Sequence, residues 1–293
     1  MKATKEFANA KVNLFLDVVS KRKDGFHDIK TVMHSVSLCD EITVRASNAK
    51  ETTIRLSSSG SKYLPTDDKN LAYRAAELFL SEAGIIAAIE IKLEKRIPIA
   101  AGLAGGSSDA AAVLRAMNRL FDRIFSEKAL YKLAERLGSD VPYCLYGKTA
   151  LCEGRGEILT KLPDTLKLNF VIVASNEYMS TPKAYQALDE KYSDFDGTVA
   201  TGGDDKYESL MKFVYEGDKL TGELFNVFES VVLSKCSRAD NAKQRLISLG
   251  ADTAMMSGSG PSVFGIFESK SMAEVAYNAL KNEGYIAFIA SSV

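Results

Sequence analysis

The chain has only four cysteines among its 293 residues. Cys39, Cys144, Cys152 and Cys236 show neither CxxC spacing nor histidine neighbours at the intervals that zinc sites use. This pattern argues against a structural metal and against a disulfide framework, and it indicates free thiols in a reducing compartment. We therefore expect a cytoplasmic protein.

The chain also lacks an excess of either sign of charge, and it lacks long apolar runs. Lys and Arg number 37 against 38 Asp and Glu, which gives a net charge of −1 and argues against a protein that coats nucleic acid or a membrane. No apolar run approaches the about 18 residues of a membrane-spanning helix, and no secretory leader is evident at the N-terminus. We expect small-molecule partners, no nucleic acid and no membrane; the oligomeric state stays unknown.

Two well-known phosphate-binding motifs are missing. The segment Gly147–Thr149 resembles the end of a Walker A loop, but Pro142 stands where the first glycine belongs. Two glycine pairs, at 154/156 and 258/260, lack the third glycine of the dinucleotide fingerprint.

A small-residue loop, Pro98–Ser108, is present and runs directly into a helix-forming segment. Gly102, Gly105 and Gly106 admit positive φ and close approach, so successive backbone N–H groups can turn toward one anion. The two serines that follow add hydroxyls where the helix begins, and a helix start favours anions. The loop predicts a phosphate cradle, the alternative being a plain strand-to-helix connection.

Hydrophobic periodicity predicts a mixed order of strands and helices. Strands are expected at 12–19, 32–36, 41–46, 52–56, 89–93, 170–174, 253–255, 263–267 and 286–290. Helices are expected at 71–83, 127–137, 182–188, 207–215, 239–249 and 271–283, with another directly after the loop. The length suits one large or two modest domains. We place a boundary near Lys161–Lys167, between domains 1–162 and 163–293, and a surface loop at Asp194–Asp205.

Local chemistry predicts several helix details. The helix after the loop has an apolar face from Val113 to Ile124 and carries Asn118 on its polar face. The next helix is expected to stop at Gly138 in the left-handed C′ conformation. Asp140 precedes Val141-Pro142, a pattern typical of a helix N-cap.

Lys11 and Asp140 are candidate catalytic residues. Phosphoryl transfer to a hydroxyl needs charge stabilisation and a group that orients or deprotonates the attacking oxygen. Lys11 stands in an apolar strand, where the alternative is an edge lysine with its ammonium in water.

Phe26 beside His27 offers an aromatic face and a hydrogen-bonding imidazole, a platform for a flat base. The loop around Gly258, taken alone, favours a hairpin turn.

Three segments together resemble the motifs of the GHMP kinase superfamily. They are Ala10–Leu16 with Asp24–His27, then Pro98–Ser108, then Ser257–Phe264, and the resemblance spans nearly the whole chain. It implies an α+β protein, a two-lobed α/β sandwich with a ribosomal-S5-domain-2-like N-lobe and a ferredoxin-like C-lobe.

The resemblance also implies an ATP- and Mg²⁺-dependent kinase. The segments Asp24–His27 and Gly138–Pro142 point to the member that phosphorylates the 2-hydroxyl of a cytidine diphosphate methylerythritol in the non-mevalonate isoprenoid pathway. Asp140 would take the hydroxyl proton, while Lys11 keeps Asp140 ionised and steadies the attacking oxygen. ATP would bind at Pro98, Ile99, Ala100, Ala101, Gly102, Leu103, Ala104, Gly105, Gly106, Ser107 and Ser108.

The same resemblance assigns the substrate side. Phe26 and Tyr185 would sandwich the cytosine, and His27 would read its hydrogen-bonding edge. Thr181 and Asn13 would lie near the sugar or the diphosphate.

The second motif departs from its glycine-rich form. Ala100, Ala101 and Ala104 stand where other members carry glycine, so we expect negative φ there and a stiffer loop. Asp109, where some members carry asparagine, could serve magnesium or cap the helix; the metal ligands stay unknown.

Two other functions remain open. One is a related kinase that acts on homoserine, mevalonate or a sugar, which would not need the paired aromatics and His27. The other is a nucleotide-binding sensor that transfers nothing.

Overall fold

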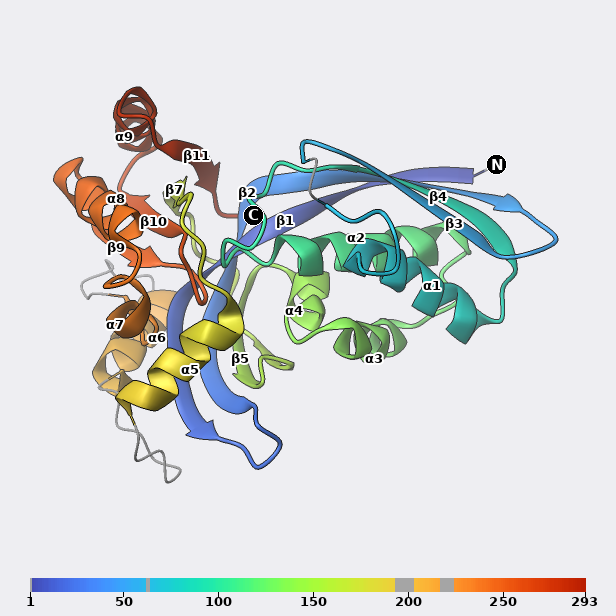
Figure 1. The fold of residues 1–293 in the computed structure, drawn as a ribbon, viewed down its shortest axis with the longest axis horizontal. Helices are drawn as coiled ribbons and strands as arrows, with labels where there is room; N and C mark the ends of the chain where they lie inside the picture. The colour runs from blue at the N-terminus through green and yellow to red at the C-terminus, as the bar shows by residue number, and fades with distance from the viewer. Residues whose placement is uncertain (1, 62–63, 193–202, 217–223) are drawn as a thin grey trace. The chain divides into compact units, whose positions relative to one another are not determined.

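A computed structural model of the chain describes residues 2–61, 64–192, 203–216 and 224–293 (Figure 1). The strands are β1 (Lys2–Lys21), β2 (His27–Asn48), β3 (Thr53–Ser59), β4 (Ala87–Glu94), β5 (Thr149–Gly154), β6 (Ile158–Lys161), β7 (Asn169–Ala174), β8 (Phe225–Asn226), β9 (Thr253–Met256), β10 (Val263–Phe267) and β11 (Ile286–Ser291). The helices are α1 (Leu71–Ala83), α2 (Gly105–Leu120), α3 (Glu127–Leu137), α4 (Val141–Tyr146), α5 (Thr181–Lys191), α6 (Asp204–Glu216), α7 (Glu229–Val232), α8 (Ser237–Ser248) and α9 (Lys270–Asn282). The expected α+β class is confirmed.

The chain divides into two compact units, each built from several segments. Unit 1 comprises Met1–Ala10, Cys39–Ile99 and Ala104–Gly147. Unit 2 comprises Lys11–Leu38, Ala100–Leu103 and Lys148–Val293. Strands β1 and β2 therefore each contribute residues to both units. The boundary near residues 161–167 stays a prediction.

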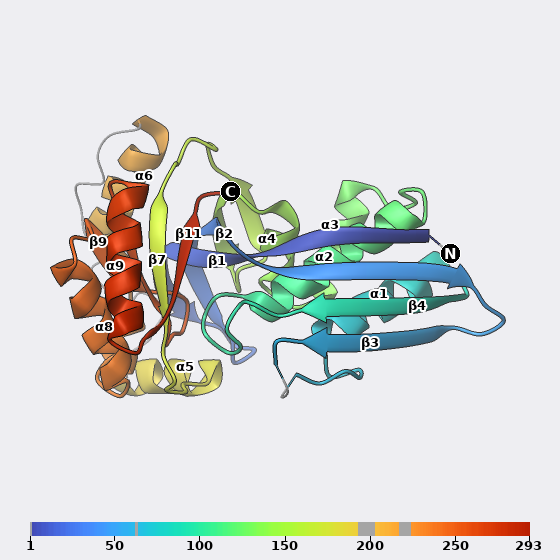
Figure 2. The same cartoon turned by 90° about the horizontal axis from the view of Figure 1, so that it is seen from above.

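Unit 1 packs helices against one face of a sheet. β4 pairs parallel with β3 and antiparallel with Glu41–Asn48 of β2, and Figure 2 shows these strands side by side. Every second residue of β4 is buried, namely Ala87, Ile89, Ile91 and Leu93. This period of two is what a strand with one covered face requires.

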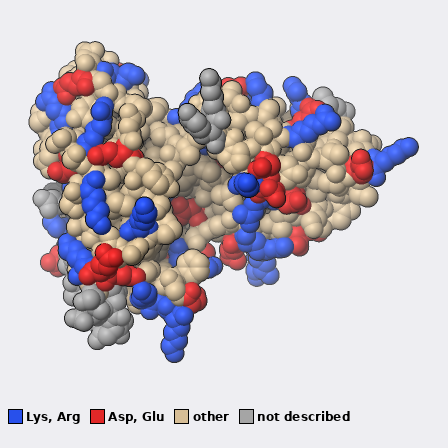
Figure 3. All heavy atoms as spheres, viewed as in Figure 1, with Lys and Arg blue, Asp and Glu red and all other residues tan. Residues whose placement is uncertain are grey.

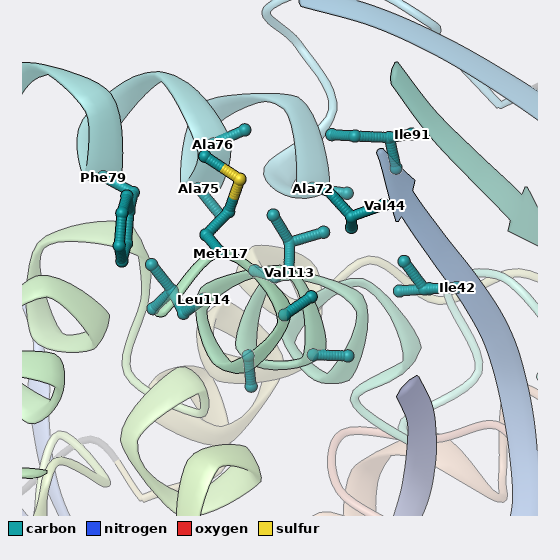
Figure 4. Close-up of a cluster of buried hydrophobic side chains, with 14 of the residues drawn as sticks. Ile42, Val44, Ala72, Ala75, Ala76, Phe79, Ile91, Val113, Leu114 and Met117 are labelled. Atoms are coloured by element: carbon teal, nitrogen blue, oxygen red, sulfur yellow. The ribbon is translucent and has the colours of Figure 1, made fainter. Parts of the chain in front are cut away.

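Helices α1 and α2 supply the other half of this core. Ile42, Val44 and Ile91 of the sheet meet α1 and α2 in one buried cluster (Figure 4). The helix side chains labelled there are Ala72, Ala75, Ala76 and Phe79 of α1, and Val113, Leu114 and Met117 of α2. This packing fixes α2, and therefore also the point where the small-residue loop enters it.

Unit 2 has its own antiparallel sheet in the order β11-β7-β10-β9. Helices α8 and α9 pack on this sheet, and their side chains share a core with β7 and β10. β9 and β10 form a hairpin, with Val263 opposite Met256. Residues Ile29–His34 of β2 pair with β5, and Phe15 of β1 pairs with Phe225 of β8.

The surface mixes both signs of charge. On the face shown in Figure 3, basic and acidic side chains are interspersed, in keeping with the net charge of −1. Within the described ranges, no helix has the length and apolar character needed to cross a membrane. All four cysteines are free, as expected.

Two expected strands are one. Segments 32–36 and 41–46 both belong to β2, so the prediction of a break between them was wrong. The backbone stays extended through Asp40 because its buried carboxylate accepts the N–H groups of Arg96 and Ile97. Likewise, the strand expected at 12–19 is the middle of the longer β1.

The helix after the loop is shorter than its apolar pattern predicts. α2 ends at Leu120 because Asp122 and Arg123 adopt positive φ, and Ile124 is exposed beyond it. Asn118, expected on the polar face, is buried and bonds both the N–H and the carbonyl of Phe125. A side chain that satisfies a turn in this way is buried without cost to its polar atoms.

Gly138 ends α3 as expected, but with φ 169° and ψ 158° it is extended and not left-handed. The expected surface loop Asp194–Asp205 lies outside the described residues as far as residue 202, and its last two residues begin α6. Strands β5, β6 and β8 and helix α7 were not predicted.

Candidate active site

In the loop Pro98–Ser108, three residues before α2 adopt the left-handed backbone conformation, and α2 begins at Gly105. Gly102 has φ 76°, and Ala100 and Ala104 have φ 53° and 54°. The expectation of negative φ at these alanines was therefore wrong at Ala100 and Ala104. The turn imposes the left-handed conformation whichever residue occupies it, and an alanine there stores about 1–2 kcal/mol of strain.

Packing excludes a side chain at Gly102 and leaves little room for one at Gly105. A Cβ atom at Gly102 would lie 2.1 Å from the carbonyl oxygen of Ser257. A Cβ atom at Gly105 would lie 3.0 Å from Cγ2 of Ile97 and 3.2 Å from Nζ of Lys95. Close approach thus accounts for both glycines without any ligand.

The start of α2 nevertheless has the character of an anion site. Ala104 is the residue before the helix and gives no side-chain cap. The first N–H groups of a helix have no intrahelical acceptors and carry the positive end of the dipole. Ser108 directs its hydroxyl to the carbonyl of Asn9 at 2.5 Å, so its hydroxyl proton is not available to an anion. Of the two serines, Ser107 is the half-buried one.

Lys11 is a buried cation of unit 2 and not an edge lysine with its ammonium in water. It is 4% exposed, and its Nζ donates to Asn13 Oδ1 at 2.7 Å and to the carbonyl of Gly102 at 2.9 Å. Asn13 is itself oriented, because its Nδ2 donates to Thr31 Oγ1 at 2.8 Å and Thr31 donates to the carbonyl of Phe15. The ammonium is therefore held in one place by two oxygen acceptors.

The hairpin loop between β9 and β10 lies beside this ammonium. A Cβ at Gly258 would come within 3.2 Å of Lys11 Nζ, and Ser257 Oγ donates to the carbonyl of Gly102 at 3.0 Å. Asn226 ties the loop down, since its Nδ2 donates to the carbonyls of Met256 and Gly258. Asn226 gave no signal in the sequence, because its role depends on strands far along the chain.

Asp140 lies in unit 1, directly before α4. Its backbone is helical, with φ −83° and ψ −12°, and its side chain makes no capping hydrogen bond. Asp140 thus occupies the N-cap position of α4, with Pro142 in the first turn, as the sequence pattern predicts, but its side chain does not cap the helix. Its pairing with Lys11 stays a prediction.

Phe26, His27 and Tyr185, the residues expected at the cytosine, all belong to unit 2. The turn before Phe26 is closed by Asp24, whose Oδ1 accepts the Phe26 N–H at 3.1 Å. The Phe26 ring is 54% exposed, whereas His27 is buried. The His27 ring stacks on Tyr185 with centroids 4.7 Å apart and 24° between planes. The stacked neighbour of Tyr185 is thus His27, and a cytosine between Phe26 and Tyr185 stays a prediction.

Asp189 bonds a ring nitrogen of His27, and this role was not predicted from the sequence. Its Oδ1 lies 2.7 Å from His27 Nε2, and its Oδ2 accepts from Lys21 Nζ at 2.6 Å. Partial burial acts to raise the pKa of Asp189, but the hydrogen bonds from Lys21 and His27 outweigh it and lower that pKa. Nearby in the same unit, Thr181 Oγ1 lies 2.9 Å from Ser259 Oγ.

Asp109 neither caps α2 nor faces outward as a metal ligand. It is 2% exposed and accepts from Lys95 Nζ at 2.8 Å, so both expectations for it were wrong. Within the described part of the chain, no group of three or more His, Cys, Asp or Glu side chains could hold a metal ion.

Comparison with known proteins identifies the class. Residues 70–148 match the GHMP kinases N terminal domain, and residues 210–286 match the GHMP kinases C terminal domain. The chain belongs to the GHMP kinase family, and it is an enzyme of the phosphotransferase class that acts on an alcohol group.

The relatives that match over most of the chain carry a more specific name than the family. The chain is 40% identical over 290 residues to the 4-diphosphocytidyl-2-C-methyl-D-erythritol kinase of Acetivibrio thermocellus, covering 98% of both chains. It is 42% identical over 277 residues to the protein of that name in Caldicellulosiruptor saccharolyticus, covering 94% of this chain and 89% of the relative. A crystal structure of 4-(cytidine 5'-diphospho)-2C-methyl-D-erythritol kinase matches with TM-score 0.81 and 32% identity over 98% of both chains. These likenesses confirm the two-lobed GHMP kinase fold.

Proposed function

We propose that the chain transfers the γ-phosphoryl group of ATP to the 2-hydroxyl of 4-diphosphocytidyl-2-C-methyl-D-erythritol, giving the 2-phosphate and ADP. Near-full-length similarity to the kinases of that name supports the substrate. The structural observation that carries the chemistry is the buried ammonium of Lys11, held against the carbonyl of Gly102 in the phosphate loop. The reaction belongs to the non-mevalonate route to isoprenoid precursors, and a cytoplasmic location stays a prediction.

ATP has a defined place in this proposal. Its phosphates lie along Pro98–Ser108, where the backbone N–H groups at the start of α2 favour anions. Magnesium, when bound, would supply neutralisation of the negative charge on the transferring phosphoryl group. The described residues contain no group of three or more His, Cys, Asp or Glu side chains that could hold it, so phosphate oxygens and water would be expected to supply most of its ligands.

The protein's own groups handle the proton and the attacking oxygen. Asp140 accepts the proton of the 2-hydroxyl, that oxygen forms the new bond to the γ-phosphorus, and the bond to the bridging oxygen breaks with its electron pair leaving on ADP. Lys11 is suited to steady the attacking oxygen, because Asn13 and Gly102 fix its ammonium. Phe26, His27 and Tyr185 receive the cytosine, and Thr181 and Asn13 the sugar or diphosphate.

A coupled ADP-release assay on the purified chain tests this function. We expect turnover with 4-diphosphocytidyl-2-C-methyl-D-erythritol and none with homoserine or mevalonate. Turnover only with homoserine or mevalonate would assign the chain to another small-molecule kinase. Nucleotide binding without turnover on any acceptor would make it a sensor.

Asp140→Asn tests the mechanism in the same assay. Turnover should fall by roughly 10²–10⁴, the range for losing a positioned acid or base, while ADP affinity stays within a few-fold. Asp122→Asn is the matched control, since Asp122 is an exposed carboxylate of the same unit. Near-normal turnover of Asp140→Asn would exclude Asp140 as the base.

A further inference from the structure

Three ionisable side chains are buried together inside unit 1. Asp40 is 0% exposed, Asp109 2% and Lys95 8%. Lys95 Nζ donates to Asp109 Oδ2 at 2.8 Å and also to Asp40 Oδ2. One ammonium therefore bonds two carboxyl groups, and the burial of all three side chains shields the excess charge from bulk solvent.

The cluster joins the two ends of the phosphate loop. Asp40 belongs to β2, Lys95 directly follows β4, and Asp109 lies in α2. Asp40 Oδ1 accepts the N–H groups of Arg96 and Ile97, at 2.5 Å and 2.9 Å, and these two residues immediately precede Pro98. Lys95 Nζ also lies 3.2 Å from the position that a Cβ of Gly105 would take. The entry to the loop and the helix that leaves it are thus tied to the same three side chains.

The charges of the cluster balance only with one additional proton. Two carboxylates and one ammonium leave a net negative charge, which is costly to bury. Asp109 Oδ1 is buried and has no hydrogen-bond partner among the described residues. Burial raises the pKa of Asp109, Lys95 opposes this, and the nearby carboxyl of Asp40 adds to the rise. Helices α1, α3 and α4 also pack on α2, but the charges that act on Asp109 come from Lys95 and Asp40.

We propose that Asp40, Lys95 and Asp109 form a positioning cluster for the loop Pro98–Ser108, neutralised by one proton on the carboxyl group of Asp109. Asp40 positions the loop entry through the backbone of Arg96 and Ile97, and Asp109 positions the start of α2 through Lys95. Loss of the proton places uncompensated charge beside the loop and loosens both ends. This inference rests on the proposed role of the loop in binding ATP.

ADP binding by calorimetry, followed against pH, tests the cluster. Measurements run above about pH 7.5, where the nucleotide phosphate is fully ionised because its second pKa is near 6. Wild-type affinity should weaken as pH rises, whereas Asp109→Asn, which resembles the neutral acid, should bind within about threefold of wild type at the lowest pH and show no such loss. Identical pH dependence in the two proteins would overturn the assignment of the proton to Asp109.

Asp40→Asn tests the positioning role, because its amide group turns a donor toward Lys95. We expect the KM for ATP to rise at least about tenfold with a smaller change in kcat, since repulsion between this donor and the Lys95 ammonium displaces the oxygen that anchors the loop entry, while Lys11 and Asp140 remain. Glu90→Gln, an exposed carboxylate of the neighbouring β4, is the control. A folded Asp40→Asn with wild-type KM would overturn the role of Asp40.

Thermal unfolding separates failure of this inference from failure of the proposed function. If the wild type binds no nucleotide, the function fails, but the cluster still predicts that Asp109→Asn flattens the fall of Tm with rising pH. An unchanged Tm profile would overturn the cluster by itself. The same measurement shows whether Asp40→Asn is folded at the assay temperature.

Discussion

Two alanines of the small-residue loop Pro98–Ser108 adopt backbone conformations that alanine disfavours. Ala104 sits at φ 54° directly before α2, where alanine costs about 1–2 kcal/mol relative to its ordinary conformations. Glycine relieves this cost but adds about 0.4–1 kcal/mol of chain entropy in the unfolded state. We expect Ala104→Gly to raise the free energy of unfolding by up to about 1 kcal/mol, measured by urea denaturation.

Ala129→Gly should change the free energy of unfolding in the opposite direction. Ala129 lies inside α3 with ordinary helical geometry, so its replacement should lower the free energy of unfolding by about 1 kcal/mol. If both glycine variants destabilise the protein equally, Ala104 carries no strain.

Helix α5 shows how one element serves a site through helical spacing. Tyr185 and Asp189 are four residues apart, so they share a face, and they hold the ring and the edge of His27. Asp189→Asn removes the charge that holds His27 Nε2 and Lys21 Nζ while keeping the shape. We expect the KM for the cytidylyl substrate to rise by about tenfold, the effect of weakening a partly buried hydrogen bond to a charged group.

Steady-state kinetics against each substrate checks this prediction. The KM for ATP and the kcat should stay within about twofold, because α5 does not carry the phosphate loop. Glu190→Gln, the next residue of α5, pairs with Gln186 and is the matched control. An effect on ATP alone would contradict the assignment of His27 to the cytidine end.

Helices and strands whose ends are marked by residues close in the sequence were predictable. α1, α3 and β10 begin and end at the expected residues. Asn70 and Ser126 cap the two helices with their own side chains, and such caps depend on residues within one turn. β2 was not predictable as one strand, because Asp40 is satisfied by Arg96 and Ile97, which lie far along the chain.

At the scale of the whole molecule, the two units bury ionisable groups with opposite responses to pH. In unit 2, burial lowers the pKa of His34 from 6.5 to about 4, with a smaller opposing effect of Asp164. The unfolded chain then takes up this proton first, so stability decreases as pH falls from about 6.5 to about 4, by roughly 3 kcal/mol in all.

Asp109 in unit 1 responds in the other direction. Its native pKa is raised above the ordinary 3.8, so the native state keeps a proton that the unfolded chain has lost. Its contribution is fully present below the unfolded pKa and is lost as pH rises through the native pKa. Acid should therefore weaken unit 2 first, and alkali unit 1.

Hydrogen exchange, corrected for intrinsic rates, measures this difference at about pH 5 and about pH 9. Amides of β5, where Thr149 bonds His34 Nδ1, should lose protection in acid, and those of the first turns of α2 in alkali. His34→Gln should abolish the first loss and Asp109→Asn the second. Equal losses in both units at each pH would contradict the assignment.

The sequence by itself determined the family, the α+β class and the small-residue loop that leads into α2, because motifs, periodicity and caps depend on residue types at short spacing. Only the tertiary structure decided which polar side chains are buried and with which partners. Lys11 meets the carbonyl of a residue 91 positions away, and Lys95 meets Asp40 across 55 positions. A buried charge is tolerated only where such partners converge, and that convergence is a property of the folded chain.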